Sequence, residues 1–356
     1  MLIIKSDNFA SNSHLLCKNT NFSWITEIPE GAVFADSGQR SFQELATIFG
    51  YSVEPFISPN YKKSAEVLGS NPPWYFYIGK KKFITRAKQY SEIYSDFRSS
   101  FDTNQIDIHQ SISSFLEILE PAKYNPVLVD TQYEDHFKKS IKPHLANGML
   151  PVPKYTRTKT KTGRLSVHTG PNVLTMHAGL RAGLEGSHQI DFISMEPNFL
   201  LKYIGKSPSD NLYDDIRSSI FNDSITRVKV KIATISALYG SDRSDKFAKT
   251  ISDYFCLDKV VAELEQRIVN DTIRNEYGRL INLQGARGRH LLSLWLQSSA
   301  TDGALYGFYN FKKNNDIKAL WIIHDALIFI GDEKAISTKE LDIGLGIKLP
   351  VKVDKI

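Results

Sequence analysis

The hydrophobic and polar positions divide the chain into stretches with different periods. Residues 1 to about 80 mix short apolar runs with polar connectors that contain Gly and Pro, which indicates a small mixed unit. From about Lys80 to Ala146 the apolar residues recur every three or four positions, so we expect helices that are interrupted at prolines. The polar, β-branched stretch PKYTRTKTKTGRLS that follows favours an extended chain.

The second half of the chain alternates between strand and helix patterns. HQIDFISM is typical of a short strand that carries Asp191, and SDNLYDDIRSSIF of an amphipathic helix. SITRVKVKIATISALYG is rich in β-branched residues, but strict alternation fails. Arg227, Lys231, Ile235 and Tyr239 are instead spaced four apart, which on a helix forms one stripe. In KALWIIHDALIFIGDE, apolar arms flank a polar pair, which predicts a β-hairpin.

Length and composition indicate an ordinary globular chain. With 356 residues, 42% hydrophobic and 23% charged, the chain is long enough for two or three domains, and disorder, collagen-like repeats and a coiled coil are excluded. The apolar runs are too short or too interrupted to enter a membrane. Two cysteines cannot form a disulfide framework, which fits a reducing compartment, so we expect a cytoplasmic location.

The net charge of +5 says little by itself, but its distribution is uneven. The stretch from Lys138 to Arg164 has eight basic residues and no Asp or Glu, while the rest of the chain has 36 basic against 39 acidic residues. This basic segment is a candidate for binding phosphates.

Two carboxylates stand out because apolar residues surround them in the sequence. Asp191 and Asp325 are far apart, yet each lies at the tip of a predicted strand. A buried carboxylate needs a cation, hydrogen bonds or a metal, and a convergent pair could hold divalent ions for phosphoryl transfer. The alternative is an ordinary turn aspartate and a strand-end cap.

The helical stripe offers a second piece of chemistry. Arg227 and Lys231 would present two cations to the same ligand, and Tyr239 continues their face. Such a face suits a triphosphate with a base stacked beyond it, and the alternative is a solvated basic helix surface.

Read in order, these segments resemble the motif series of the family A, polymerase I-like DNA polymerases. NGMLPVPKYTRTKTKTGRLSVHTGPNVL resembles the family's TGRLS and PN signature, and IDFISME, RVKVKIATISALYG and IIHDALIFIGDE resemble its motifs A, B and C. YGRLINLQGAR with LWLQSSATDGAL, and the tail GIKLPVKVD, resemble three further family segments. The resemblance runs from about residue 138 to the end, with weaker helical agreement back to about 80.

The resemblance implies an α+β right-hand fold with an antiparallel palm sheet, helical fingers and a short helical thumb. We expect a small N-terminal unit of open role over 1–80, a thumb-like helical region over 81–150, palm over 151–199 and 276–356, and fingers over 200–275. It further implies a compact, phage-like, template-directed DNA polymerase for replication or repair, which adds dNTPs to a primer.

The resemblance also assigns roles to single residues. Asp191, Asp325 and the backbone carbonyl of Phe192 would hold two Mg²⁺ ions, for which Mn²⁺ can substitute. Lys231 would also act as a cationic or proton-donating group at the leaving pyrophosphate. The residues implied to contact the incoming nucleotide are Arg227, Lys231, Ile235, Tyr239, Glu196 and Ser194, with Glu196 as the gate that excludes a 2′-hydroxyl.

A further set of residues is implied to contact primer-template DNA. Arg164, Asn172, Arg289, Gln297 and His324 match positions near the primer terminus, where minor-groove contacts sense correct pairing. Of these, Arg289 and Gln297 are the most loosely aligned, and helix-surface roles are equally compatible with the sequence. From the basic segment we expect Lys154, Arg157, Lys159 and Lys161 to contact duplex phosphates.

The sequence departs from the family pattern at several positions. Ile235 replaces an aromatic ring that usually stacks on the nucleotide, Ala326 replaces the glutamate after the motif C aspartate, and Ser293 stands where an asparagine is usual. The segment between Tyr239 and Gly278 is compact, which implies short fingers. No nuclease pattern precedes the polymerase-like part, so we expect no 3′-to-5′ proofreading.

Two other functions remain open at this stage. A single-subunit RNA polymerase-like enzyme shares motifs A, B and C, although Glu196 argues against admitting a ribose. A DNA-binding replication subunit with lapsed catalysis would explain Ile235 and Ala326. The N-terminal region could dock a processivity factor, a helicase or another replisome subunit.

Overall fold

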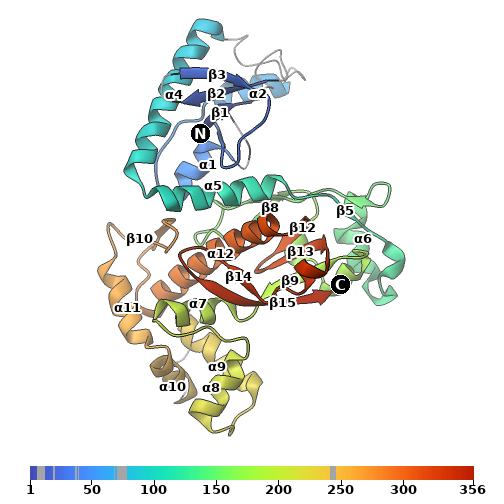
Figure 1. Ribbon diagram of the computed structural model, residues 1–356, viewed down its shortest axis with the longest axis vertical. Coiled ribbons are helices and arrows are strands. Elements are labelled where there is room, and N and C mark those ends of the chain that lie inside the picture. The colour runs from blue at the N-terminus through green and yellow to red at the C-terminus, as the bar shows by residue number, and fades with distance from the viewer. Residues whose placement is uncertain are drawn as a thin grey trace. The chain divides into compact units, whose positions relative to one another are not determined.

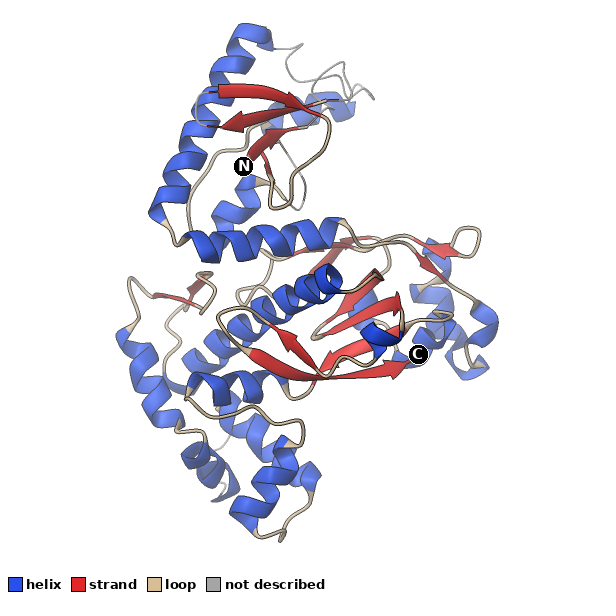
Figure 2. Ribbon diagram, viewed as in Figure 1, coloured by secondary structure: helices blue, strands red, loops and turns tan. Residues whose placement is uncertain are grey.

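The computed structural model describes residues 1–5, 13–18, 21–36, 38, 40–67, 69, 78–240 and 246–356. The chain forms two compact units, Met1–Ile118 and Leu119–Ile356. Each unit combines sheet and helices, so the mixed α+β class expected from the sequence is confirmed (Figure 2). Among the described residues, every helix is either too short or too polar to cross a lipid bilayer.

The first unit is built on a four-stranded sheet with the order β3-β2-β1-β4. Its strands are β1 (Leu2–Ile4), β2 (His14–Lys18), β3 (Asn21–Ile25) and β4 (Val33–Phe34). Neighbouring strands are antiparallel except β1 and β4, which are parallel. The helices of this unit are α1 (Phe42–Ile48), α2 (Pro59–Val67), α4 (Lys80–Ser100) and α5 (Thr103–Glu117).

Helix α4 belongs to this unit because its apolar face enters the same core. Phe42 of α1 contacts Tyr90 and Phe97 of α4 edge to face, at 5.5 and 5.3 Å between ring centroids. These rings are buried together with Leu2 and Ile4 of β1. The unit therefore continues past residue 80, where the sequence placed a boundary, and the region expected to be thumb-like is divided between the two units at Ile118.

The second unit contains a five-stranded antiparallel sheet with the order β12-β13-β9-β15-β14 (Figure 1). Its strands are β9 (His188–Phe192), β12 (Ile317–Ile323), β13 (Ala326–Gly331), β14 (Glu340–Asp342) and β15 (Lys348–Lys355). The predicted hairpin is confirmed, since β12 and β13 pair directly and His324 and Asp325 form their turn. The predicted strand with Asp191 is also confirmed, as β9 at the centre of the sheet.

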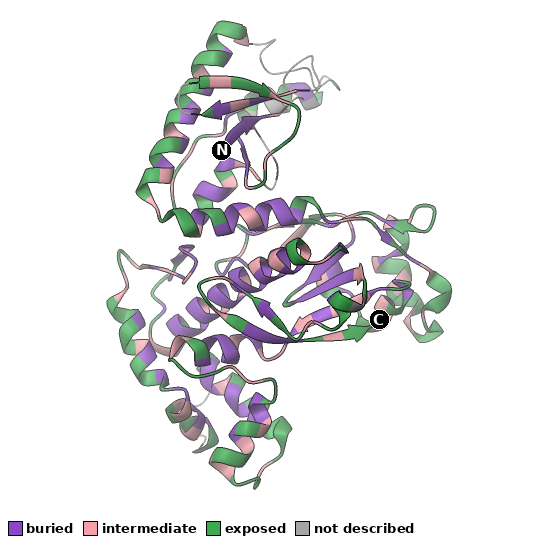
Figure 3. Cartoon of the chain, in the orientation of Figure 1, coloured by how far each residue is buried: buried purple, intermediate pink, exposed green. Residues whose placement is uncertain are grey.

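One long helix, α12 (Gly288–Asn314), packs on this sheet and is buried along most of its length (Figure 3). It contacts β12, β14 and the shorter helix α7 (Met195–Tyr203). Gly307 permits the close approach, because a Cβ at this position would lie 3.0 Å from the ring of Phe192.

A group of four helices carries the predicted cationic stripe. These are α8 (Leu212–Phe221), α9 (Arg227–Tyr239), α10 (Lys246–Tyr254) and α11 (Leu257–Gln266). Helix α9 confirms the helical interpretation of its β-branched sequence. It begins where the Thr226 hydroxyl accepts a hydrogen bond from the Lys229 amide, and it ends at Gly240 in the left-handed conformation.

Short elements connect these parts. Three two-stranded ribbons pair β5 (Ala122–Lys123) with β6 (Met149–Leu150), β7 (Lys154–Thr156) with β8 (Ser166–Thr169), and β10 (Thr272–Arg274) with β11 (Leu280–Asn282). The short helices are α6 (Glu134–Ser140) and α13 (Glu333–Ile336), with 3₁₀ turns at Pro126–Leu128, Thr131–Tyr133, Lys142–His144, Val173–Thr175 and Ala178–Gly183.

A buried ion pair joins three of these segments. The Arg279 guanidinium donates to both Asp302 carboxylate oxygens at 2.7 Å and to the Arg157 carbonyl at 3.0 Å. Asn275 donates to the same carboxylate at 2.8 Å. Gly163 lies against the guanidinium, where a Cβ would be only 2.5 Å away. The pair thus holds the chain around Arg157 against α12.

Removal of this carboxylate should destabilise the second unit. Asp302→Ala leaves the Arg279 charge buried without its partner, which costs about 3–5 kcal/mol. Urea unfolding followed by fluorescence measures the loss. Glu134→Ala, which breaks the exposed pair of Glu134 with Lys138 in the same unit, is the matched control and should leave the transition unchanged. Equal midpoints for the two variants would contradict a structural role for the buried pair.

Candidate functional site

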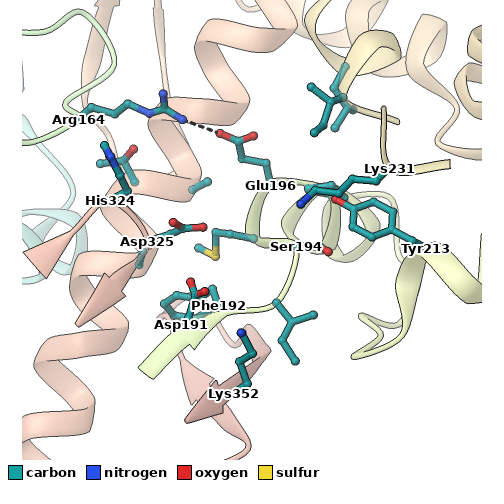
Figure 4. A pocket seen from close by; sticks show the side chains of 18 of the residues that line it. Arg164, Asp191, Phe192, Ser194, Glu196, Tyr213, Lys231, His324, Asp325 and Lys352 are labelled. Atoms are coloured by element: carbon teal, nitrogen blue, oxygen red, sulfur yellow. Dashed lines mark hydrogen bonds and ion pairs between the residues drawn. The ribbon is translucent and has the colours of Figure 1, made fainter. Parts of the chain in front are cut away.

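A cavity of about 610 Å³ lies in the second unit beside the central strand of the sheet (Figure 4). Its walls come from β9, the β12–β13 turn, β15, α7, α9 and α12. Of the residues predicted from the sequence, the following line it: Arg164, Asp191, Phe192, Ser194, Glu196, Arg227, Lys231, Ile235, His324 and Asp325. The fold therefore brings together residues that are up to 161 positions apart in the chain.

The two predicted carboxylates are neighbours on adjacent strands. Ala326 of β13 pairs with Asp191 of β9, so Asp325 comes just before the paired position. The Phe192 amide donates to the Asp325 carbonyl at 3.3 Å, and His324 completes the turn with a φ of 55°. Figure 4 shows both carboxyl groups directed into the cavity. The strand register thus fixes the pair.

Burial and the nearby Asp325 charge raise the pKa of Asp191 to about 6. Lys352, which is opposite Asp191 in the β15–β9 register, and Arg181 act in the other direction. Burial and the repulsion from Asp325 together outweigh these two cations. A bound cation would relieve this repulsion.

The pair fits a hard divalent cation such as Mg²⁺. The described residues contain no cluster of three or more His, Cys, Asp or Glu side chains suited to a metal. Mg²⁺ is commonly held by one or two carboxylates together with water and substrate phosphates, and it does not need a complete protein cage. Asp191 and Asp325 supply that minimum, and Phe192, which also lines the cavity, follows Asp191 directly.

Helix α9 presents the predicted cations to the same cavity. The Arg227 guanidinium bonds to Asp214 at 3.0 Å and lies 5.4 Å from the centre of the Tyr213 ring. The Lys231 ammonium, one turn further, has neither an ion pair nor a hydrogen bond among the residues that the structure describes. Ile235, 42% exposed, continues the stripe along the cavity wall. The helix therefore offers one anchored and one available cation.

Glu196, in the first turn of α7, connects three parts of the site. Its carboxylate accepts from Arg164 at 3.2 Å and from the Tyr239 hydroxyl at 2.7 Å. Burial, followed by the Glu196 charge, raises the pKa of Tyr239 to about 12. With its side-chain amide in the orientation that satisfies both ends, Gln297 of α12 accepts from the Arg164 guanidinium at 3.2 Å and donates to the Thr162 hydroxyl at 3.1 Å. Arg164, Glu196, Tyr239 and Gln297, predicted separately, form one polar network.

The predicted basic segment is only partly a surface. Lys154, Lys159 and Lys161 are exposed, as is Asn172. Arg157 is an error of the sequence analysis, because its side chain is fully buried and cannot contact duplex phosphates. Its carbonyl instead accepts the hydrogen bond from Arg279.

Arg289 is not among the residues that line the main cavity. Its guanidinium donates to Ser252 at 2.6 Å and to Asp258 at 2.7 Å, and its side chain is only 10% exposed. It lines a separate cavity of about 190 Å³ beside α10 and α11, apart from the carboxylate pair. Its position in the fold is therefore that of a residue that ties α12 to the neighbouring helices.

Three residues that shape the cavity were not predicted from the sequence. Tyr213 lies under Arg227, Asp210 lines the wall before α8, and Lys352 faces Asp191 from β15. Tyr213 is on the buried side of α8, within the stretch expected to be an amphipathic helix, but only the strand register shows that Lys352 is opposite a carboxylate.

The raised pKa of Asp191 predicts a pH-dependent stability. The folded chain retains this proton up to about pH 6, while the unfolded chain loses it near the ordinary pKa of 3.8, so folding becomes less favourable as the pH rises between these values. Asp191→Asn removes the penalty. In chelator-containing buffer it should therefore gain roughly 1–2 kcal/mol over the native chain across this interval, after allowance for solvent screening.

Denaturant unfolding at half-unit pH steps measures this difference. The exposed Asp316→Asn is the control, and its difference from the native chain should be independent of pH. A pH-independent difference for Asp191→Asn as well would show that folding does not raise the pKa of this carboxyl group.

The comparisons with known proteins find similar solved structures but no matching family model or curated sequence. Among solved structures, the chain is similar to the POL domain of Pol1 from M. smegmatis in complex with DNA primer-template and dNTP, with a TM-score of 0.43 and 15% sequence identity. The match covers 87% of this chain and 62% of that one, so the chain spans less than two thirds of the length of this neighbour.

Proposed function

We propose that the chain is a template-directed DNA polymerase that adds deoxynucleotides to the 3′-end of a primer. The observation that carries the proposal is the placement of two adjacent carboxylates, Asp191 and Asp325, in the same cavity as the cationic stripe of α9. Carboxylates on one wall of the cavity and cationic side chains on another suit a substrate whose polyanionic end binds together with a divalent cation.

The cationic wall would bind the triphosphate. Lys231 has an available ammonium, and Arg227 is oriented by Asp214 and Tyr213, so the two can engage neighbouring phosphates. When bound to Asp191 and Asp325, Mg²⁺ would supply charge neutralisation and activation of the primer hydroxyl. On the side of the leaving group, Lys231 would donate a proton to the pyrophosphate.

The geometry around Glu196 favours a deoxynucleotide. Arg164 and Tyr239 hold this carboxylate at the cavity wall, where a long side chain would obstruct a 2′-hydroxyl. This supports a DNA polymerase over the single-subunit RNA polymerase alternative. Ile235 offers an exposed apolar surface to the sugar and base in place of a stacking ring.

The proposal includes a compact family A architecture. The five-stranded sheet with α7 and α12 would correspond to the palm, and α8 to α11 to the fingers. Primer-template DNA would meet the exposed part of the basic segment, followed by Arg164, Gln297 and His324 near the primer terminus. Contacts of this kind to phosphates and the minor groove are independent of sequence, as a polymerase requires.

Primer extension with purified protein tests the proposal. Asp191→Asn and Asp325→Asn should each reduce incorporation of dNTPs with Mg²⁺ by at least 10³-fold, because each removes a charge that the cation requires. Both variants should bind primer-template DNA about as well as the native chain, measured by fluorescence anisotropy. Asp316→Asn, exposed and outside the cavity, is the control and should extend normally.

Each other result has a definite meaning in this assay. Extension by neither the native chain nor the variants, with Mg²⁺ or Mn²⁺, would exclude polymerase activity and leave a DNA-binding role. Equal incorporation of ribonucleotides would favour the RNA polymerase alternative.

The exposed part of the basic segment predicts the salt dependence of DNA binding. Combined substitution of Lys154, Lys159 and Lys161 by Gln should weaken binding to all sequences. The plot of log K against log salt should become less steep by about 3, since each phosphate contact contributes about 0.9 to its steepness. Filter binding between 50 and 200 mM salt measures both. Arg157→Gln is the contrasting variant, because the buried side chain should affect unfolding and leave the slope unchanged. A slope change for Arg157→Gln alone would refute this division.

A further inference from the structure

The first unit has a strongly uneven distribution of charge. Residues 1–118 contain 11 Lys and Arg against 12 Asp and Glu, which is close to neutral. Five of these cations fall between residues 80 and 88, and no acidic residue occurs between 80 and 91. The rest of the unit has 6 basic against 12 acidic residues. One short stretch therefore carries a positive charge on an otherwise acidic unit.

This stretch is the beginning of helix α4, where cations are unfavourable. The helix starts with Lys80, Lys81 and Lys82, has no acidic residue in its first turn, and receives no side-chain cap from Gly79. The positive end of the helix dipole repels lysines at these positions, typically by 0.3–1 kcal/mol each. The arrangement works against helix stability, which points to an anionic ligand.

The lysines are available for such a ligand. Lys80, Lys81, Lys82 and Lys88 are exposed, and none of their ammonium groups has an ion pair or hydrogen bond with any residue that the structure describes. Arg86 differs, since it donates to the Pro55 carbonyl at 3.2 Å and lies over the Tyr90 ring, which fixes the helix to its core.

The spacing of these residues makes a surface along more than one turn. Lys81, Ile84 and Lys88 follow at i, i+3 and i+7 and so share one face of α4. Ile84 is 47% exposed between the two lysines. Lys80 and Lys82 flank Lys81 in the first turn, one on either side of this face. We call all five residues, Lys80, Lys81, Lys82, Ile84 and Lys88, the α4 cationic face.

We propose that the α4 cationic face binds the sugar–phosphate backbone of DNA, so that the first unit is a second, sequence-independent DNA contact of this chain. The identity of the ligand rests on the proposed function. DNA held by the second unit is present at high effective concentration for a unit on the same chain. Lysine point charges around one aliphatic side chain suit phosphates and sugars, whereas lysine is depleted in protein interfaces, which favour Arg and aromatic anchors.

The experiment uses the full chain with Lys80, Lys81, Lys82 and Lys88 all changed to Gln. Binding of a fluorescent primer-template duplex is titrated between 50 and 200 mM salt. We expect at least tenfold weaker binding at the lower salt concentration. The plot of log K against log salt should also become less steep by about 3 to 4. A charge-matched control changes four exposed lysines of the second unit outside the cavity to Gln: Lys318, Lys339, Lys348 and Lys355. It should keep most of the affinity and slope.

Two further measurements make the outcome decisive. Thermal unfolding of the α4 variant should show an unchanged or higher midpoint, because cations are removed from a helix N-terminus. Single-nucleotide extension at saturating DNA should stay within about twofold of the native rate, since the reacting groups belong to the second unit. DNA binding and slope equal to those of the control would overturn the proposal.

The same set of results separates this proposal from the proposed function. Loss of DNA affinity in the α4 variant of a chain that never extends primers would keep the cationic face and exclude the polymerase. Normal extension with unchanged DNA affinity would do the reverse. Binding of phosphatidylserine vesicles or poly-glutamate through α4, with no effect on DNA, would also overturn the proposal in favour of another anionic partner.

Discussion

The site depends on the electrostatic repulsion between two carboxylates that the sheet holds next to each other. Asp191 is on β9 and Asp325 immediately precedes β13, and the hydrogen-bond register between these strands leaves neither free to move away. Burial and this repulsion raise the pKa of Asp191. A structure that keeps such a pair at a cavity is destabilised without a cation and stabilised with one. The cations of α9 and the gate at Glu196 have their proposed roles only because this pair fixes where a phosphate can be bound.

Helix α12 keeps the other walls of the cavity in place relative to that pair. Gln297 binds Arg164 and Thr162, and five residues later Asp302 binds Arg279, whose guanidinium reaches the Arg157 carbonyl. Both contacts therefore hold the same basic segment against a helix that packs on the sheet. The segment can present exposed lysines on one side because it is anchored by buried polar groups on the other. This explains why a buried ion pair is found here although such pairs contribute little net stability.

The sequence was informative where chemistry and local periodicity coincide. Asp191 and Asp325 interrupt apolar strand patterns, and the four-residue spacing of α9 is a local property, so these elements and their faces could be predicted. The pairing between distant segments could not be predicted. The burial of Arg157 depends on Arg279 and Asp302, more than 120 residues away, and the position of Lys352 opposite Asp191 depends on strand register. The boundary at Ile118 likewise depends on which core receives the aromatic face of α4.

The distribution of charge follows from the same electrostatic constraint. In the proposed function, positive charge attracts the polyanionic substrate and the two carboxylates repel it. A weak excess of positive charge spread evenly over the surface would therefore neither retain the substrate nor direct it. Concentrated charge in otherwise balanced surroundings acts differently, because screening confines each patch to about 10 Å at 0.1 M salt. The exposed lysines around residues 154–161 and those of α4 are two such patches, one in each unit. In the proposed function, each patch would hold a phosphate backbone without neutralising Asp191 and Asp325, and these carboxylates would stay available for the proposed cation.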